Sequence, residues 1–216
     1  MKIYGYGIEL VRVRHEDIEL VRKKRNSLLV RQYMEFREEI TPEMQEKWFL
    51  SINNRRNNYF IICMNGEKIG LVYGAEIDWE KKETGNGGIF IWDEKWLESS
   101  VSLMASFVLI EITFLLGLER TYVKILRTNE RAIRFNHDLG YELLPGQENI
   151  QNQHYVLNGN IFFSRTEKVR KALVAQFGST FEVVMDTPGD DSEQHMFSLY
   201  EALPAENRKR LIVRRL

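Results

Sequence analysis

The sequence contains little cysteine, with Cys63 as the only one in 216 residues. A single cysteine cannot form a disulfide within the chain, and no group of cysteine and histidine residues has the spacing of a zinc site. We therefore expect neither a disulfide framework nor a metal site.

An excess of charge of one sign is also lacking, because 30 Lys and Arg residues stand against 31 Asp and Glu residues. Proteins that bind nucleic acids need a surplus of positive charge to hold the phosphate backbone. The near-neutral balance therefore argues against nucleic acid as a partner. The opening residues, MKIYGYGIEL, lack the basic and then apolar pattern of a signal peptide, so a cytoplasmic location is expected.

Residues 101–118, VSLMASFVLIEITFLLGL, approach the length of a membrane span. About 20 residues cross a bilayer, and Glu111 in the middle of this run would be costly in lipid. A helix that is apolar on all sides is also typical of one buried inside a soluble α/β protein. We expect a buried helix here and no membrane span.

The residues that are present favour a packed domain, since 44% are hydrophobic and 12% aromatic. Apolar periodicity and turn residues divide the chain into elements. The expected strands are residues 8–14, 59–64, 69–77, 88–92, 121–126, 141–144, 154–157 and 181–185. The expected helices are 16–24, 28–34, 42–52, 101–118, 130–139, 161–177 and 192–203, and the basic tail 208–215 is expected to be a solvated or partner-docked terminus.

Two local signals support this division. Asn65 and Gly66 separate two apolar runs and have the chemistry of a tight hairpin turn. Thr41 precedes Pro42, which is the usual order of an N-cap and a first helical residue.

Residues 129–141, NERAIRFNHDLGY, follow an apolar strand and open a short helix that ends at Gly140. This segment resembles the Asn-x-x-Ala-x-x-(aromatic/Leu)-Tyr-x-x-x-Gly-Phe segment of the GNAT superfamily of acyl-CoA-dependent N-acyltransferases, and the order of elements is similar as well. The resemblance implies an α/β (α+β) fold with a mixed, mostly antiparallel sheet, flanked by helices and splayed between strands four and five. It implies an acyltransferase domain over residues 1–177, with 178–216 as a C-terminal extension of unknown role.

A second segment, RNSLLVRQYM at residues 25–34, resembles GNATs that acetylate amino groups on nucleotide-linked deoxysugars. This implies a small primary amine as acceptor, a nucleotide-linked amino sugar first among them, with Arg25, Asn26 and Tyr33 at the acceptor end. Guanidinium and amide groups suit sugar hydroxyls and phosphates. Two alternatives stay open: a GNAT-fold binding or partner module with weak or no catalysis, and a protein N-terminal acetyltransferase. A homodimer also stays open.

The resemblance implies acetyl-CoA as co-substrate and places its binding residues. The loop before the long helix would hold the pyrophosphate, with Ser100 and Ser102 at positions where the family has glycine. The fourth strand would bind the thioester carbonyl through its peptide groups, and Asn129 and Arg131 would reach the pantetheine arm and the phosphates. The full expected set is Phe90, Ile91, Trp92, Ser99, Ser100, Val101, Ser102, Leu103, Asn129 and Arg131.

Catalysis in this family is direct attack of a neutral amine on the thioester through a tetrahedral intermediate, which needs a base for the amine and favours an acid for the thiolate. Many members use a tyrosine as the acid where this sequence has Asn136, with His137 beside it. Either the thiolate leaves without a protein acid or activity is reduced. The candidate bases are Asp93, Glu94, His154 and the pair Glu76 and Asp78, which strand alternation places on one face.

Overall fold

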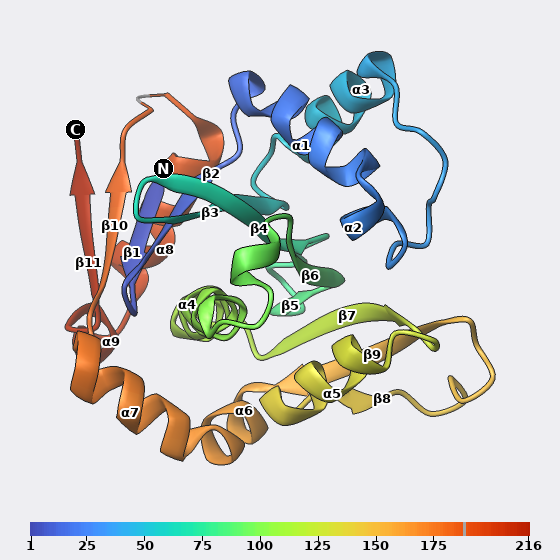
Figure 1. Cartoon of the computed structure of the whole chain (residues 1–216). Coiled ribbons are helices and arrows are strands. Elements are labelled where there is room, and N and C mark those ends of the chain that lie inside the picture. The colour runs from blue at the N-terminus through green and yellow to red at the C-terminus, as the bar shows by residue number, and fades with distance from the viewer. Residues whose placement is uncertain (188) are drawn as a thin grey trace.

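A computed structural model describes residues 1–187 and 189–216 and shows two sheets packed around a central helix (Figure 1). The larger sheet has the order β11-β10-β1-β2-β3-β4-β6, and the smaller one β5-β7-β9-β8. The strands of the larger sheet are β1 Lys2–Gly5, β2 Ile8–Arg12, β3 Asn58–Met64, β4 Glu67–Ala75, β6 Asn86–Ile91, β10 Phe181–Met185 and β11 Leu211–Arg215. Those of the smaller sheet are β5 Glu83–Thr84, β7 Arg120–Leu126, β8 Glu142–Leu143 and β9 Asn152–Asn158.

The helices cover the sheets in two groups (Figure 1). The first group is α1 Ile18–Asn26, α2 Leu28–Arg31 and α3 Pro42–Ile52, and the second is α4 Val101–Leu115, α5 Glu130–Leu139, α6 Gly159–Arg165, α7 Glu167–Phe177, α8 Asp191–Ala202 and α9 Ala205–Arg208. Short 3₁₀ turns, η1 His15–Asp17 and η2 Glu94–Trp96, precede α1 and α4. Within the described chain, no helix has the length and apolar run needed to cross a bilayer.

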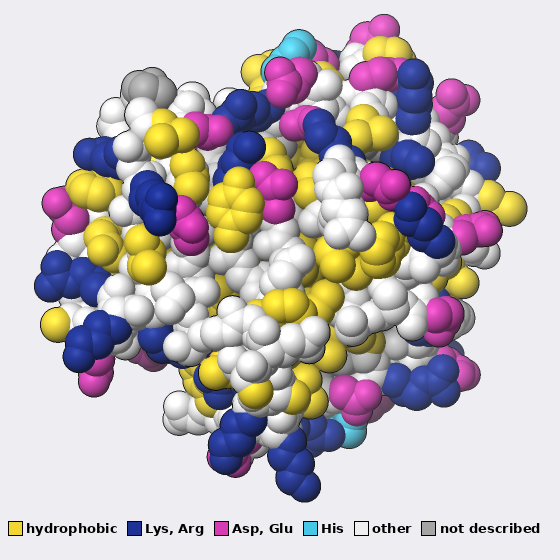
Figure 2. Space-filling view, turned by 60° about the vertical axis from the view of Figure 1, so that its left-hand side comes forward, with side chains coloured by type: hydrophobic (Ala, Val, Ile, Leu, Met, Phe, Trp, Pro, Cys, Tyr) yellow, Lys and Arg dark blue, Asp and Glu magenta, His cyan; other side chains and the backbone are white. Residues whose placement is uncertain are grey.

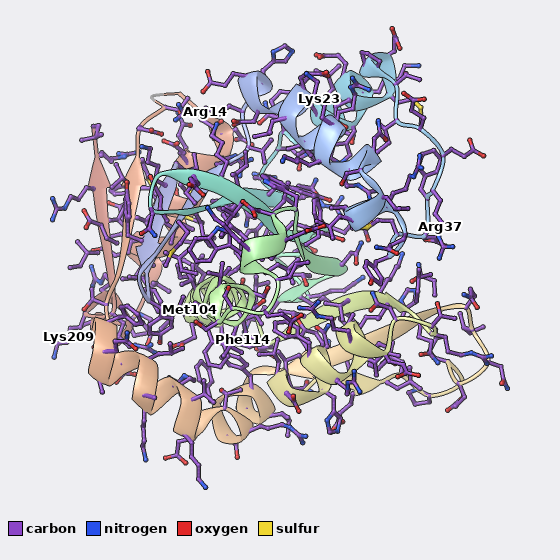
Figure 3. All side chains as sticks on the ribbon, in the orientation of Figure 1. Arg14, Lys23, Arg37, Met104, Phe114 and Lys209 are labelled. Carbon is purple, nitrogen blue, oxygen red and sulfur yellow. The ribbon has the colours of Figure 1, made fainter. Side chains whose placement is uncertain are left out.

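The central strands of the large sheet are buried on both faces because their side chains alternate between two hydrophobic clusters. Phe60 and Ile62 of β3 pack in the cluster that contains α4, and Ile61 and Cys63 pack in the cluster formed with α1 and α3. Figure 3 shows Met104 and Phe114 projecting from α4, which lies in the centre of the molecule. The long apolar run therefore forms the buried helix that the sequence predicts.

The predicted turn chemistry is confirmed. Asn65 and Gly66 have left-handed φ angles of 52° and 78° between β3 and β4. Thr41 caps α3 by accepting a hydrogen bond from the Met44 amide at 3.3 Å, with Pro42 as the first helical residue.

Three features at the ends of the chain differ from the prediction. The strand expected at 8–14 is the second strand of a hairpin, since Tyr6 and Gly7 turn the chain with φ of 49° and 75° and β1 pairs with β2. The single helix expected at 161–177 is two helices, because Thr166 between them departs from helical geometry, with φ of −96° and ψ of 7°.

The third difference is the tail. Residues 208–215 are not a solvated terminus, because Leu211–Arg215 forms β11 and pairs in parallel with β10. β10 in turn pairs antiparallel with β1, so residues 178–216 extend the large sheet at the edge that Figure 1 shows on the left.

The sheet is splayed where the sequence predicts it, between β6 and β7. These strands belong to different sheets but approach at their beginnings, where a Cβ on Gly87 would lie 3.3 Å from the Tyr122 carbonyl. The predicted mixed, mostly antiparallel α/β fold is thus confirmed.

Gly140 ends α5 in the left-handed region, with φ of 102°, and a Cβ there would meet Ile161 at 3.1 Å and Leu157 at 3.2 Å. Gly140→Ala is expected to lower the free energy of unfolding by about 1–3 kcal/mol, because the conformation is strained for alanine and the site is crowded. Urea denaturation measures this. Gly117→Ala is the control, since φ is 95° but nothing lies within 4 Å of the added Cβ. Equal losses in both variants would show that the contacts with Ile161 and Leu157 do not matter.

Candidate active site

The splay between β6 and β7 opens into a cavity of about 1070 Å³. One side of it, here called the helix side, is lined by the N-terminus of α4 and by α5, through Ser99, Ser100, Ser102, Leu103, Asn129 and Arg131. The other, here called the aromatic side, is lined from α1, α3, β3 and β4 and the segment after α2, through Arg25, Tyr33, Gln45, Trp48, Tyr59 and Tyr73.

The helix side presents backbone donors. The first amides of a helix have no carbonyl of their own helix to bind. Ser99 Oγ accepts from the Val101 amide at 3.3 Å and donates to the Trp96 carbonyl at 2.7 Å. The amides of Ser102 and Leu103 follow in the same turn, and both residues line the cavity. Such a turn favours an anionic group.

Side chains of α5 complete this side. Asn129 caps α5, with Oδ1 accepting from the Ala132 amide at 3.1 Å, which leaves its NH₂ group as the donor for a ligand. Arg131 donates to the Leu97 carbonyl and forms an ion pair with Glu98 at 3.2 Å. Arg131 thereby offsets the negative charge that Glu98 places beside the α4 N-terminus.

The aromatic side is a cluster of rings. Tyr59 and Tyr73 stack with their centroids 4.7 Å apart, and Trp48 meets Tyr59 edge-on at 5.4 Å. The Tyr73 hydroxyl lies against β6, because a Cβ on Gly88 would come within 2.9 Å of it. Burial raises the pKa of Tyr59 and of Tyr73 above the ordinary tyrosine value, so both hydroxyls are protonated at neutral pH.

Most of the predicted cofactor residues lie together. The cavity lining includes Phe90, Ile91, Ser99, Ser100, Ser102, Leu103, Asn129, Arg131 and, from the other predicted sets, Asn136, Arg25 and Tyr33. Trp92 and Val101 are buried in the core, at 4% and 1% exposure, and do not belong to the lining.

The predicted shared face of Glu76 and Asp78 is wrong. β4 ends at Ala75, and Glu76 then has a left-handed φ of 56°, which breaks the alternation. Asp78 Oδ1 accepts from the Lys81 amide at 3.0 Å inside a separate turn. Among the described residues that line the cavity, neither carboxylate is present. Asp93 likewise caps η2 by accepting from Lys95 N.

The other predicted polar residues have local partners. Asn136 lines the cavity, and its Nδ2 donates to the Ala132 carbonyl at 2.9 Å. His137 has 65% of its side chain exposed and contacts Arg165, while His154 lies on β9 opposite Lys124. Asn26 binds both the amide and the carbonyl of Ile40 at 2.9 Å, so it holds the segment that leads into α3.

Sequence reasoning did not find Gln45, Trp48, Tyr59 and Tyr73. A two-residue turn at Asn65-Gly66 alone would place Tyr59 opposite Val72. A bulge between Ile62 and Cys63 shifts the register, so Tyr59 pairs with Tyr73 and their rings stack. The sequence could have predicted the stacking of Tyr59 and Tyr73 only if the bulge, and with it the strand register, were known.

Comparison with known structures agrees with the fold described above. The apo structure of FdhC, a nucleotide-linked sugar GNAT, superposes with a TM-score of 0.66 at 18% identity, covering 80% of this chain and 98% of that one. Spermidine N-acetyltransferase from Vibrio cholerae, with CoA and spermine, has a TM-score of 0.62 at 15% identity, covering 73% and 98%. RimL, a ribosomal α-N-protein acetyltransferase with coenzyme A, has a TM-score of 0.60 at 14% identity, covering 70% and 94%.

The family model of the acetyltransferase (GNAT) domain matches residues 8–142. No curated protein matches by sequence. A match over more than half of the chain, on a fold of this kind, shows that the protein belongs to the GNAT family of acetyltransferases. It is therefore a transferase that uses acetyl-CoA as co-substrate.

The helix side fits this co-substrate. The first-turn amides of α4 suit its pyrophosphate, the serines in place of glycine are small and keep their N–H groups, and Arg131 pairs with the one unfavourable carboxylate, Glu98. Acetyl-CoA supplies the acetyl group as a thioester.

Glu98→Gln is expected to tighten CoA binding by about 3- to 10-fold, because a charge near the phosphate position disappears and Arg131 is released from its ion pair. Calorimetric titration of CoA measures the change. Glu94→Gln is the control, on a carboxylate outside the described lining. Unchanged or weaker binding in Glu98→Gln would contradict the placement of the phosphates at α4.

Proposed function

We propose that the protein transfers the acetyl group of acetyl-CoA to the primary amine of a small molecule, a nucleotide-linked amino sugar. The observation that carries this is the continuity of one cavity from the α4 N-terminus to the aromatic side. A co-substrate at the helix side and an amine at the aromatic side would meet at β6, whose residues Gly87 and Gly88 line the cavity.

The size of the acceptor is limited by the segment between α2 and α3. Glu35, Phe36 and Ile40 of this segment line the cavity. Glu35 Oε2 also accepts a hydrogen bond from Asn152 Nδ2 at 2.7 Å, which joins the segment to β9 in the smaller sheet. A segment held across the opening suits a small acceptor better than a protein chain, and the likeness to a nucleotide-linked sugar GNAT supports a sugar.

We also propose which residues of the described lining transfer protons. The amine must be neutral to attack the thioester. Two lining carboxylates are described, Glu98, paired with Arg131, and Glu35, which is bound only by an uncharged amide. Glu35 is therefore the lining group suited to accept the amine proton. The protonated hydroxyl of Tyr73 beside β6 is a donor for the departing thiolate.

A thiol-release assay with acetyl-CoA over a panel of amines tests the proposal. The panel contains nucleotide-linked amino sugars, spermidine, an aminoglycoside and a peptide with a free N-terminus. The expected result is turnover on an amino sugar with the highest kcat/KM. Preferred turnover on the peptide would instead indicate a protein N-terminal acetyltransferase, and acetyl-CoA binding without turnover on any amine would indicate a binding module.

A further inference from the structure

Arg25 presents a half-buried guanidinium to the cavity, and this group is unpaired among the described residues. It lies in the last turn of α1, and its guanidinium carbon is 5.8 Å from the centre of the Phe90 ring. Its Nη1 atom is buried and has no hydrogen-bond partner among the described residues. Burial lowers the pKa of the guanidinium below its ordinary value, and the side chains that oppose this are the hydroxyls of Tyr73 and Tyr59.

A buried guanidinium normally has a carboxylate close to it, because an unpaired charge removed from water is costly. Arg12 is the contrast in this chain: its guanidinium donates to Ser192 and Asn58 at 2.9 and 3.2 Å, and the carboxylates of Asp190 and Glu193 act on it electrostatically. None of the ion pairs formed by the described residues includes Arg25, which lines the cavity instead. A ligand that enters the cavity could supply the partner that the Arg25 guanidinium lacks among the described residues.

Gln45 is a second, independent donor of the same kind. It lies on α3, which packs against α1, and only 3% of it is exposed. Its Nε2 atom is buried and without a partner among the described residues, although Gln45 lines the same cavity. Two neighbouring helices, α1 and α3, thus each contribute an unpaired donor to the lining of one side of the cavity. A ligand group with several acceptor oxygens could bind both donors.

The remaining charges of the lining disfavour a cationic ligand. The carboxylate of Glu98 is paired with Arg131, so that the positive side chains of Arg25 and Lys124 stand against the single carboxylate of Glu35 among the described lining residues. A polyamine would bring several positive charges next to Arg25 and Lys124, with only Glu35 to receive them.

We propose that Arg25 and Gln45 form an anion subsite that determines acceptor specificity, so that the acceptor is a primary amine that also carries a phosphate or a carboxylate. This inference rests on the proposed acetyl transfer and narrows the acceptor to one chemical class, the amines that carry an anionic group. A polyamine or an uncharged amino sugar is then expected to be a poor substrate. Arg25 contacts the anionic group and selects the acceptor, and the acetyl transfer itself takes place at β6.

The test is calorimetric titration at saturating CoA, which keeps anionic probes from the α4 N-terminus. The probes are glucosamine 1-phosphate and glutamate, against glucosamine and spermidine. Binding of the phosphate or carboxylate probe is expected to be at least about 10-fold tighter than that of glucosamine, a difference typical of a charged hydrogen bond. Which anionic probe binds better identifies the anionic group. Equal binding of glucosamine 1-phosphate, glutamate and glucosamine, or no binding of any, would overturn the proposal.

Arg25→Gln tests the residue itself. It is expected to abolish the preference for the anionic probe, to leave CoA affinity unchanged, and to keep or raise the melting temperature without ligand, because an unpaired buried charge is removed. An arginine with a purely structural role would give a lower melting temperature. Arg37→Gln is the matched control, since Arg37 has the same charge but lies on the segment after α2, outside the described lining (Figure 3). An intact anion preference in Arg25→Gln would overturn the proposal, whereas failure of acetyl-CoA to bind would count against acetyl transfer alone.

Discussion

Replacing Glu111 with alanine is expected to lower the free energy of unfolding by about 3–5 kcal/mol, the usual cost of removing one partner from a buried ion pair. Glu111 lies in the middle of α4 and has no exposed surface. It accepts hydrogen bonds from the Tyr6 hydroxyl at 2.6 Å, from Arg170 Nη2 at 3.4 Å and from Arg210 Nη2 at 2.5 Å. Without the carboxylate, two largely buried arginines lose their counter-ion.

Urea denaturation followed by circular dichroism measures this loss. Glu182→Ala is the matched control, because the ion pair of Glu182 with Arg214, at 2.9 Å, is partly exposed and is expected to be worth less than about 1 kcal/mol. Similar losses for the two variants would mean that the buried network does not hold the structure together.

The Glu111 network also bears on residues 178–216. It joins α4 to Tyr6 in the turn between β1 and β2, to Arg170 of α7 and to Arg210 just before β11. Together with the pairing of β10 with β1, these contacts lead us to propose that the extension folds as part of the acyltransferase domain.

Ser102→Glu is expected to weaken CoA binding by about 100-fold or more. A carboxylate in the first turn of α4 would face the phosphates at a few ångströms, where like charges repel by several kcal/mol. The same carboxylate interacts favourably with the positive end of the helix dipole, so the fold is expected to stay intact or gain stability. Because CoA affinity is expected to fall while stability stays the same or rises, a loss of binding in this variant cannot be caused by unfolding.

Calorimetry with CoA and a thermal melt measure both effects. Ser102→Gln is the matched control, since glutamine has the size of glutamate without its charge. A loss of CoA affinity that is equally large in Ser102→Gln would indicate crowding, and an unchanged affinity in Ser102→Glu would show that the phosphates bind elsewhere.

On the face drawn in Figure 2, basic and acidic side chains are interspersed over the described residues, and neither sign gathers into a continuous region. The unpaired charge of Arg25 lies instead in the cavity. Composition alone gives a balanced total and cannot locate one unpaired charge.

The sequence predicts the central part of the fold well, because its signals there are local. The hairpin at Asn65-Gly66, the cap at Thr41 and the αL residue Gly140 each depend on a few neighbouring residues. The ends of the chain were harder to predict. The pairing of β1 with β10 joins residues more than 170 positions apart in the sequence, which periodicity does not encode.

For the site, resemblance led to residues that line the helix side of the cavity, and it did not lead to Glu35 and Tyr73, the groups that we propose for proton transfer. Glu76 and Asp78 were expected to share a face because strand alternation was extended past Ala75, where the backbone turns left-handed. Glu35 and Tyr73 enter the cavity from a loop and from a bulged hairpin, and neither position follows from a sequence period.

We propose that one cavity holds the acetyl thioester and the amine acceptor on either side of β6. A crystal structure with a non-hydrolysable CoA thioester would test this arrangement. We expect the pyrophosphate at the amides of Ser102 and Leu103, the thioester carbonyl against the β6 backbone, and the acetyl group facing Tyr73. A thioester bound outside the splay of β6 and β7, or an acetyl group directed away from the aromatic side, would contradict it.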